Sequence, residues 1–441
     1  MLVDYTLIVR AARRLISVKR GLKILAIVLA LTLTFSLTAC KAGRFDNGDS
    51  AASYSQTFDE NVDVPESYGA RYAVESVDLN VAPTFGEALD SSDAVDKVYG
   101  SAVAIHAGVS GGTQLGSGTV VDIDVEYIDK SVDDSDFVYV LTCHHVIEGS
   151  NQIAVYIPKA VDAATDEYDY YEYGFAATLM GSDKKSDLAV LRIEISGHEG
   201  ISAETVTKSQ ICDDNLQIGD KIFVLGNPLG THPGTYTEGS VSRAFVEVSV
   251  ENIGKMKLMQ TNADVNHGNS GGGVYNFAGQ LVGVLNSGLS VDSDGEPVQG
   301  LGFFIPVTGA NGAEKVMKSL IETVTADHYG YVSGRWMLGA TFQQAMGGYI
   351  IQVSELSGNA TDTIHGTNIA KGDYIFEVSY GYNGETYKCE MNSISEFSTF
   401  FETMQKHLTI GDQFTVKYGR NPRGTSAITE TVTIRQHIYS I

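Results

Sequence analysis

Residues 260–285 read QTNADVNHGNSGGGVYNFAGQLVGVL, and the string GNSGG lies at the centre of this stretch, at 268–272. A serine flanked by glycines stands clear of bulky neighbours, and glycine allows a backbone turn in which consecutive N–H groups converge. Such a turn can hold the negative oxygen of a tetrahedral intermediate in acyl transfer. We therefore predict Ser270 as a nucleophile and the N–H groups of Gly268 and Ser270 as an oxyanion hole.

The residues after Ser270 distinguish between two folds that carry such a serine. GNSGG also satisfies the G-x-S-x-G pattern of α/β-hydrolases, in which a helix follows the serine directly. Here apolar pairs and runs at 274–275 and 281–285, separated by a turn at 276–279, predict strand, turn and strand. This all-β setting is that of chymotrypsin-like proteases, in which the histidine and the acid precede the serine in the chain. An α/β-hydrolase esterase would instead need a base among the later histidines, none of which lies in a comparable motif: His328, His365, His407 and His437.

A histidine and an acid do occur upstream, each at the end of a predicted strand. Residues 137–142 predict a strand that leads into His144 and His145. Adjacent histidines point to opposite sides, so only one of them can face the serine. Further on, Asp187 opens the apolar strand 188–193, where a carboxylate can orient an imidazole.

Two other ionisable residues and one acidic insertion remain as alternatives. Asp183 competes with Asp187 as the acid, and His267 competes as the base, although it lies in a tight turn three residues before the serine. The acidic insertion 122–136 could bind calcium through Asp122, Asp124 and Glu126, but no complete ligand loop follows, so we interpret it as a solvated hairpin.

With these motifs in order, residues from about 98 to 307 resemble the HtrA (DegP-like) family of trypsin-like serine proteases. In that family the histidine lies in T-x-x-H-V, and this selects His145; the resemblance likewise implies Asp187 as the acid and Ser270 as the serine. The matching pieces are GSGTVVD, LTCHHVIEG, SDLAVLRI, VLGNPLG, TEGSVSR, QTNADVNHGNSGGGVYN, GQLVGVL and GLGFFIPV. The implied fold is a chymotrypsin-like double β-barrel, closed by a helix at 311–324.

The chain departs from the family pattern at three positions near the expected site. His267 replaces the usual Pro or Arg before GNSGG, Asp264 lies two residues away from the usual acid, and Cys143 replaces a more usual Asn or Ala. None of these changes removes a member of the catalytic triad.

Composition limits the class of the protein. The 441 residues leave room for two or three domains, and 47 glycines among β-branched runs favour many short strands. The formal net charge is −24, and residues 1–39 contribute +5, so the remainder carries −24 − 5 = −29. Such a surface repels nucleic acid and anionic lipid. The four cysteines include no CxxC pair, so we expect neither a zinc site nor a disulfide framework, and no cofactor.

The N-terminal region predicts export. Six basic side chains precede an apolar run at 24–37, which suits the core of a signal peptide spanning 1–39. The run ends in LTAC at 37–40, which resembles a bacterial lipobox and implies lipidation of Cys40; an uncleaved membrane anchor is the alternative. Residues 40–92 are acidic and lack apolar periodicity, so we expect a flexible linker with a reach of roughly 40 Å.

Residues 330–441 predict a second domain, in which short strands surround a helix. The string SISE at 393–396 reads as a capping box that opens this helix. Two Gly-Asp turns, at 372–373 and 411–412, resemble those of a PDZ domain of the HtrA type. The resemblance implies that Met337, Leu338, Gly339 and Ala340 form the loop that binds a peptide carboxylate.

The combined expectation is a mainly β protein with a trypsin-like serine protease domain at 93–325 and a PDZ-like α+β domain at 330–441. The resemblance implies an ATP-independent, homotrimeric serine endopeptidase that cleaves unfolded or damaged exported proteins. We expect it to be a lipid-anchored protein of the bacterial cell envelope. The alternative is an inert chaperone or binding module that uses only the PDZ-like domain.

Overall fold

The computed structural model describes residues 79–439 except 125–136, 158–173, 196–205, 231–233, 251–252, 289–300, 310–311, 326 and 346–349. The predicted signal peptide, Cys40, most of the linker and most of the acidic insertion therefore lie outside the described residues. Within the described part, no helix combines the length and the apolar character needed to cross a membrane.

The first described residues differ from the predicted linker, because 79–92 already contribute structure. Strand β1 (Val81–Ala82) pairs in parallel with β8 (Gln210–Cys212), and helix α2 (Ser91–Val98) follows. The Asp90 side chain caps α2 by accepting from the Asp93 N–H, and Val98 is buried at the other end. The apolar run 98–105 predicts a strand from residue 98, but because α2 extends to Val98 this strand begins later, at Ala102.

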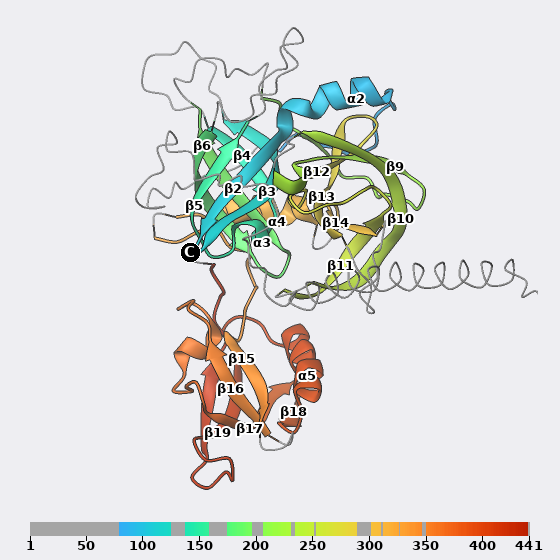
Figure 1. Ribbon diagram of the computed structural model, residues 1–441. Helices are drawn as coiled ribbons and strands as arrows, with labels where there is room; N and C mark the ends of the chain where they lie inside the picture. Colours follow the sequence, from blue (N-terminus) through green and yellow to red (C-terminus); the bar gives the residue numbers. More distant parts are fainter. Residues whose placement is uncertain are drawn as a thin grey trace, which may run out of the picture. The chain divides into compact units, whose positions relative to one another are not determined.

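Six antiparallel strands form a closed barrel in the order β2-β3-β4-β7-β6-β5 (Figure 1). Their apolar side chains fill the interior, where Ile105, Val140 and Leu191 have no exposed surface. The strands are β2 (Ala102–Val109), β3 (Gly112–Asp124), β4 (Phe137–Thr142), β5 (Ser150–Tyr156), β6 (Gly174–Asp183) and β7 (Leu188–Glu194).

A second set of strands also closes on itself. In the sheet β8-β13-β12-β9-β10-β11-β14, strand β14 pairs with β13 as well as β11, so six strands form a ring. The predicted strand, turn and strand after the candidate serine are confirmed as the antiparallel pair β12 and β13. The strands are β9 (Lys221–Gly226), β10 (Thr235–Val250), β11 (Gly254–Thr261), β12 (Gly273–Asn276), β13 (Gln280–Gly288) and β14 (Gly302–Pro306).

Helix α4 (Ala313–Glu322) follows the second barrel, inside the range predicted from the apolar spacing at i, i+4 and i+8. Its buried face carries Val316, Met317, Leu320 and Ile321, which join the same apolar core as strands β6 and β7. A one-sided apolar face of this kind explains why the helix packs against the strands instead of standing in solvent.

The C-terminal residues form a separate sheet of six strands with one long helix, α5 (Ile394–His407). The predicted cap is confirmed, because Ser393 Oγ accepts from the Glu396 N–H at 3.1 Å. Residues 336–342 predict a strand, but strand β15 begins only at Ala340, and no sequence pattern predicts the exposed strand β18. The strands are β15 (Ala340–Ala345), β16 (Ile350–Leu356), β17 (Tyr374–Tyr382), β18 (Glu385–Glu390), β19 (Gln413–Gly419) and β20 (Ile428–Thr433).

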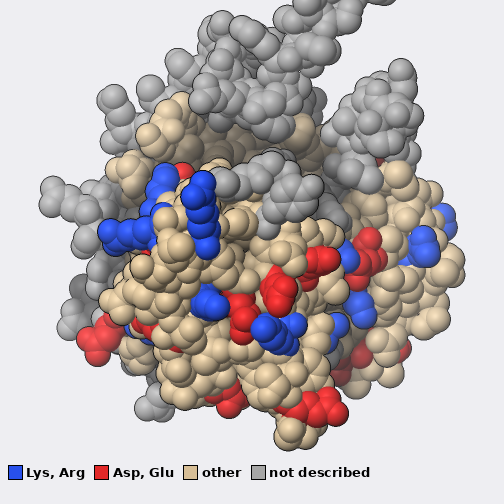
Figure 2. All heavy atoms as spheres, turned by 90° about the horizontal axis from the view of Figure 1, so that it is seen from below, with Lys and Arg blue, Asp and Glu red and all other residues tan. Residues whose placement is uncertain are grey.

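Charged side chains of both signs are mixed on the face of the molecule shown in Figure 2. Acidic and basic groups lie beside one another over the described residues of that face, so no broad basic surface is visible there.

Candidate active site

The turn that carries Ser270 depends on its glycines. Gly268 and Gly271 have φ values of 94° and 86°, in the left-handed region that side chains disfavour. A Cβ atom on Gly271 would lie 2.1 Å from the Ser117 carbonyl oxygen and 2.2 Å from Thr142 Oγ1. The first barrel therefore approaches this turn so closely that only glycine fits.

Ser117, from β3 of the first barrel, holds the turn in place. Its N–H donates to the Ser270 carbonyl at 2.8 Å, and its hydroxyl donates to the Gly268 carbonyl at 2.7 Å. The same hydroxyl accepts from the Asn227 N–H at 2.8 Å. One fully buried side chain thus fixes two segments of the second barrel to the first.

His145 and Asp187 form a hydrogen-bonded pair. His145 Nδ1 lies 2.7 Å from Asp187 Oδ2, and the His145 N–H donates to Asp187 Oδ1 at 2.9 Å. The carboxylate is fully buried, whereas 35% of the imidazole side chain is exposed. His145 belongs to the short helix α3 (His144–Ile147), which starts just after β4 ends.

The surroundings of His145 favour its protonated form. Burial by itself lowers the pKa of the imidazole, but the hydrogen bond and charge of Asp187, with a further contribution from Glu148, raise the pKa above its usual value. The backbone of Asp187 has φ = 53°, which is unusual for a residue with a side chain. The protein therefore maintains some local strain in order to place this carboxylate.

Asn286 connects the serine to this pair, and no motif in the sequence singles it out. Its side-chain amide donates to Asp187 Oδ2 at 2.5 Å, and its backbone carbonyl accepts from Ser270 Oγ at 2.9 Å. The Ser270 hydroxyl thus donates to Asn286 in this arrangement, and must rotate to donate to His145. Hydrogen bonds nevertheless link Ser270, Asn286, Asp187 and His145 in one continuous chain.

The predicted oxyanion-hole groups are available. Among the described residues, neither the Gly268 N–H nor the Ser270 N–H takes part in a hydrogen bond. Both groups flank the turn that Ser117 fixes, so they could bind an oxygen without first breaking another contact. The roles of all these residues in catalysis stay predictions.

The alternative acids and bases make other contacts. His144 is fully buried, and its Nδ1 lies 2.6 Å from Ser182 Oγ, away from the serine turn. Asp183 bonds to the Ser186 hydroxyl at 2.6 Å and lies 3.5 Å from Arg335. The side chain of His267 is exposed, and the buried Asp122 forms an ion pair with Lys208 at 2.6 Å.

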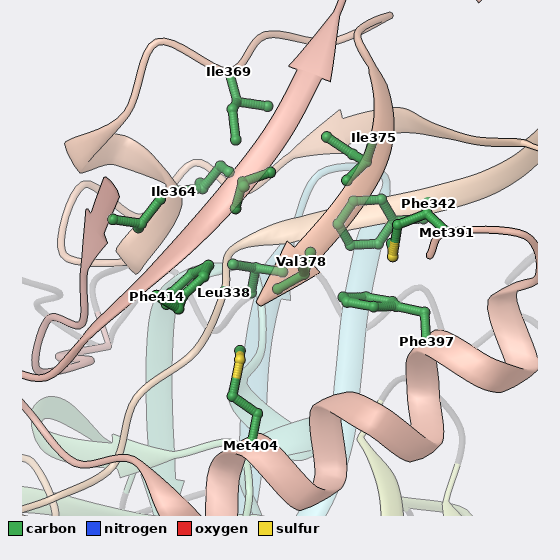
Figure 3. A pocket seen from close by; sticks show the side chains of 12 residues that line it. Leu338, Phe342, Ile364, Ile369, Ile375, Val378, Met391, Phe397, Met404 and Phe414 are labelled. Atoms are coloured by element: carbon green, nitrogen blue, oxygen red, sulfur yellow. The ribbon is translucent and has the colours of Figure 1, made fainter. Parts of the chain in front are cut away.

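The predicted carboxylate-binding loop lies beside an apolar pocket of the C-terminal domain. The carbonyls of Met337, Leu338 and Gly339 accept hydrogen bonds from Thr363, Ile364 and Ser357, so the loop is held from one side. Figure 3 shows Leu338, Phe342, Phe397 and Met404 among the apolar side chains that line the pocket. The pocket suits an apolar side chain; its role in peptide binding stays a prediction.

A comparison with protein families identifies residues 116–284 as matching the trypsin-like peptidase domain. This range contains His145, Asp187 and Ser270 and part of each of the two rings of strands. The fold is that of a trypsin-like peptidase.

Curated proteins similar to this trypsin-like chain carry related names. It is 30% identical over 315 residues to the serine protease Do-like HtrB of Bacillus subtilis, covering 68% of this chain and 60% of that protein. It is 32% identical over 246 residues to the serine endoprotease DegS of Salmonella typhimurium, covering 55% of this chain and 62% of that protein. The chain therefore spans about three fifths of the length of these relatives.

Among solved structures, the HtrA-type protease AlgW with a tripeptide aligns with a TM-score of 0.42 and 22% identity, over 78% of this chain and 97% of that one. The serine endoprotease from Yersinia pestis aligns with a TM-score of 0.42 and 25% identity, over 80% of this chain and all of that one.

Proposed function

We propose that this protein is a serine endopeptidase of the HtrA type, with Ser270 as nucleophile, His145 as general base and acid, and Asp187 as the residue that orients the imidazole. The observation that carries the proposal is the chain of hydrogen bonds from Ser270 through Asn286 to Asp187 and His145. The similarity to proteins named as serine proteases and endoproteases supports the same reaction.

The reaction follows from the chemistry of these groups. After the Ser270 hydroxyl rotates toward the imidazole, His145 takes its proton while the oxygen attacks the scissile carbonyl. His145 then gives this proton to the leaving amine, and a water molecule repeats the sequence to release the acyl group. Asp187 keeps the imidazole in the required tautomer and stabilises its charged form.

The developing oxyanion would be bound by the N–H groups of Gly268 and Ser270. Loss of one such donor in a water-excluded site costs roughly 3 kcal/mol of transition-state stabilisation, or about a hundredfold in rate. The Ser117 contacts to the carbonyls of this turn keep both donors in place before the substrate arrives.

The wider proposal concerns substrates and location. We propose that unfolded or damaged exported polypeptides are cleaved without ATP, that the C-terminal domain is PDZ-like and binds peptide C-termini, and that the enzyme is a homotrimer. The apolar pocket beside Leu338 supports the peptide-binding role. The LTAC string at 37–40 supports a lipid anchor in the bacterial cell envelope.

Labelling with a fluorophosphonate probe tests the central proposal, because the probe reacts only with an activated serine. We expect labelling and cleavage of unfolded casein by the full chain, and loss of both in Ser270→Ala. Casein cleavage by Ser270→Ala at the parent rate would show that the proposed site is wrong. Casein binding without labelling in the parent protein would favour the inert binding module instead.

A further inference from the structure

Cys143 adds a thiol to the candidate site. Its Sγ atom, a ring nitrogen of His145 and a carboxylate oxygen of Asp187 all lie within 4.8 Å of one another. Within the described part of the chain, this is the only such group of three or more histidine, cysteine or acidic side chains. The three residues lie at positions 143, 145 and 187, which do not match the spacing of a metal-binding motif. The sequence alone therefore does not indicate this group.

The donor set is one that soft or borderline divalent ions prefer. Thiolate, imidazole and carboxylate are the three ligand types that proteins offer to zinc, and the thiolate selects zinc, cadmium or cobalt over magnesium or calcium. The thiol now donates only weakly, to the Leu285 carbonyl at a distance of 3.3 Å, so little is lost when it changes partner.

Charge also favours occupation. Cys143 and Asp187 are fully buried, and an unpaired charge there would be costly. On binding a divalent ion the thiol releases its proton to solvent, so the thiolate and the carboxylate together balance the two positive charges. The neutral imidazole adds no charge, and the bound cluster is neutral overall.

Access and geometry require only small adjustments. His145 is the exposed member, with 35% of its side chain open to solvent, so an ion can arrive there and a water molecule can complete a tetrahedral shell. His145 Nδ1 and Asp187 Oδ2, now 2.7 Å apart, would have to separate by about 0.5 Å to bind one ion at ordinary zinc distances.

We propose that Cys143, His145 and Asp187 form a reversible inhibitory site for a thiophilic divalent cation such as zinc. The ion replaces the proton that His145 and Asp187 share, so the imidazole can no longer serve as the base for Ser270. The inhibitory consequence rests on the proposed peptidase function, whereas the binding of the ion does not.

Cobalt binding to the full-length Ser270→Ala protein tests the site independently of peptidase activity. We expect one equivalent of Co²⁺ to give a thiolate-to-cobalt charge-transfer absorption that zinc displaces. Replacing Cys143 with serine should remove this absorption and weaken cobalt binding at least about 100-fold. Loss of a residue that only hydrogen-bonds to a ligand weakens metal affinity up to about 100-fold, and loss of a ligand itself should weaken it at least as much. Cys212→Ser is the matched control, because Cys212 is also buried and free but lies outside the cluster.

The outcomes separate the two proposals. No cobalt–thiolate absorption in the parent, or an absorption that survives Cys143→Ser and is lost in Cys212→Ser, overturns the metal site. Circular dichroism checks folding, and Cys143→Ala serves as a second variant in case serine disturbs the buried position.

Zinc inhibition of the protein with active Ser270 tests the inhibitory consequence. Zinc should inhibit casein cleavage, and a chelator should restore it. A Cys143→Ser enzyme that remains equally sensitive to zinc also overturns the proposal. A protein that binds cobalt through Cys143 but never cleaves casein refutes only the peptidase function.

Discussion

The side-chain amide of Asn286 donates to the buried carboxylate of Asp187 at 2.5 Å, on the same oxygen that bonds His145. This bond gives the buried carboxylate oxygen a second hydrogen-bond partner beside the His145 imidazole. The same residue offers its backbone carbonyl to Ser270, so it acts on both ends of the candidate triad.

Replacing Asn286 with alanine tests this role. The backbone carbonyl that bonds Ser270 remains, but the carboxylate loses a charge-assisted hydrogen bond worth about 1.5–3 kcal/mol. We expect kcat/KM for a casein-derived peptide to fall roughly 10- to 100-fold, with fluorophosphonate labelling slowed to a similar extent. An unchanged rate would show that Asp187 needs no support from Asn286.

The pH dependence of cleavage follows from His145. The base must be neutral, and Asp187 raises its pKa above the usual value, so activity should rise with pH through a midpoint above 6.5. Replacing Asp187 with asparagine should move this midpoint down and lower kcat by roughly 10⁴-fold. A pH–rate profile of both proteins measures the shift; a midpoint that stays in place would contradict the assignment of Asp187.

The same group affects stability with a definite sign. Because the folded-state pKa of His145 is raised, its protonated form stabilises the fold fully below the unfolded value of about 6.5. This contribution is lost as the pH rises through the folded-state value. Thermal melts should therefore show that the parent loses more stability than a His145→Ala protein over the same interval. Equal losses in the two proteins would be inconsistent with the raised pKa.

Gly271→Ala should destabilise the protease domain strongly. The new methyl group would lie 2.1 Å from the Ser117 carbonyl oxygen, in a backbone with φ = 86°, and together these costs should reach about 3 kcal/mol or more. Gly219→Ala is the matched control, because Gly219 has φ = 98° but no atom within 4 Å of an added methyl group. It should cost only about 1 kcal/mol. Denaturant unfolding curves compare the two, and equal effects would show that crowding at Gly271 is unimportant.

The cap of α5 offers a test confined to the C-terminal domain. Ser393→Ala removes the acceptor for the Glu396 N–H and should lower the stability of this domain by about 1 kcal/mol. Ser395→Ala, two residues further along in the first turn of α5 and exposed, should have little effect. Fluorophosphonate labelling of Ser270 should be the same in both variants, since neither residue lies in the protease domain.

Sequence reasoning located the candidate nucleophile, base and acid because each lies in a short string with a local physical meaning. GNSGG needs glycine at Gly271, and an acid at the start of an apolar strand is conspicuous. Asn286 and Ser117 were not singled out as site residues, because asparagine and serine are common near strands. Their importance arises from contacts across 99 and 151 positions, with Asp187 and Gly268 respectively.

The segment boundaries at which the structure differs from the sequence prediction also have physical reasons. The linker was extended to residue 92 because strand β1, which pairs with β8, has only two residues, too few to show an apolar pattern in an acidic stretch. Strand β18 was missed because its residues alternate between exposed and half-buried, so the apolar pattern is weak. The cap at Ser393 was found because its signal is local.

The hydroxyl of Ser117 binds Gly268 and Asn227 at once, and it comes from the opposite barrel to both. Engineering that reshapes the serine turn in order to change substrate preference therefore cannot treat the second barrel as an independent module. Any variant that shifts this turn must keep the Gly268 carbonyl and the Asn227 N–H within hydrogen-bonding distance of Ser117 Oγ, or must include a compensating substitution on β3. Directed-evolution libraries for this protein should accordingly diversify both barrels together.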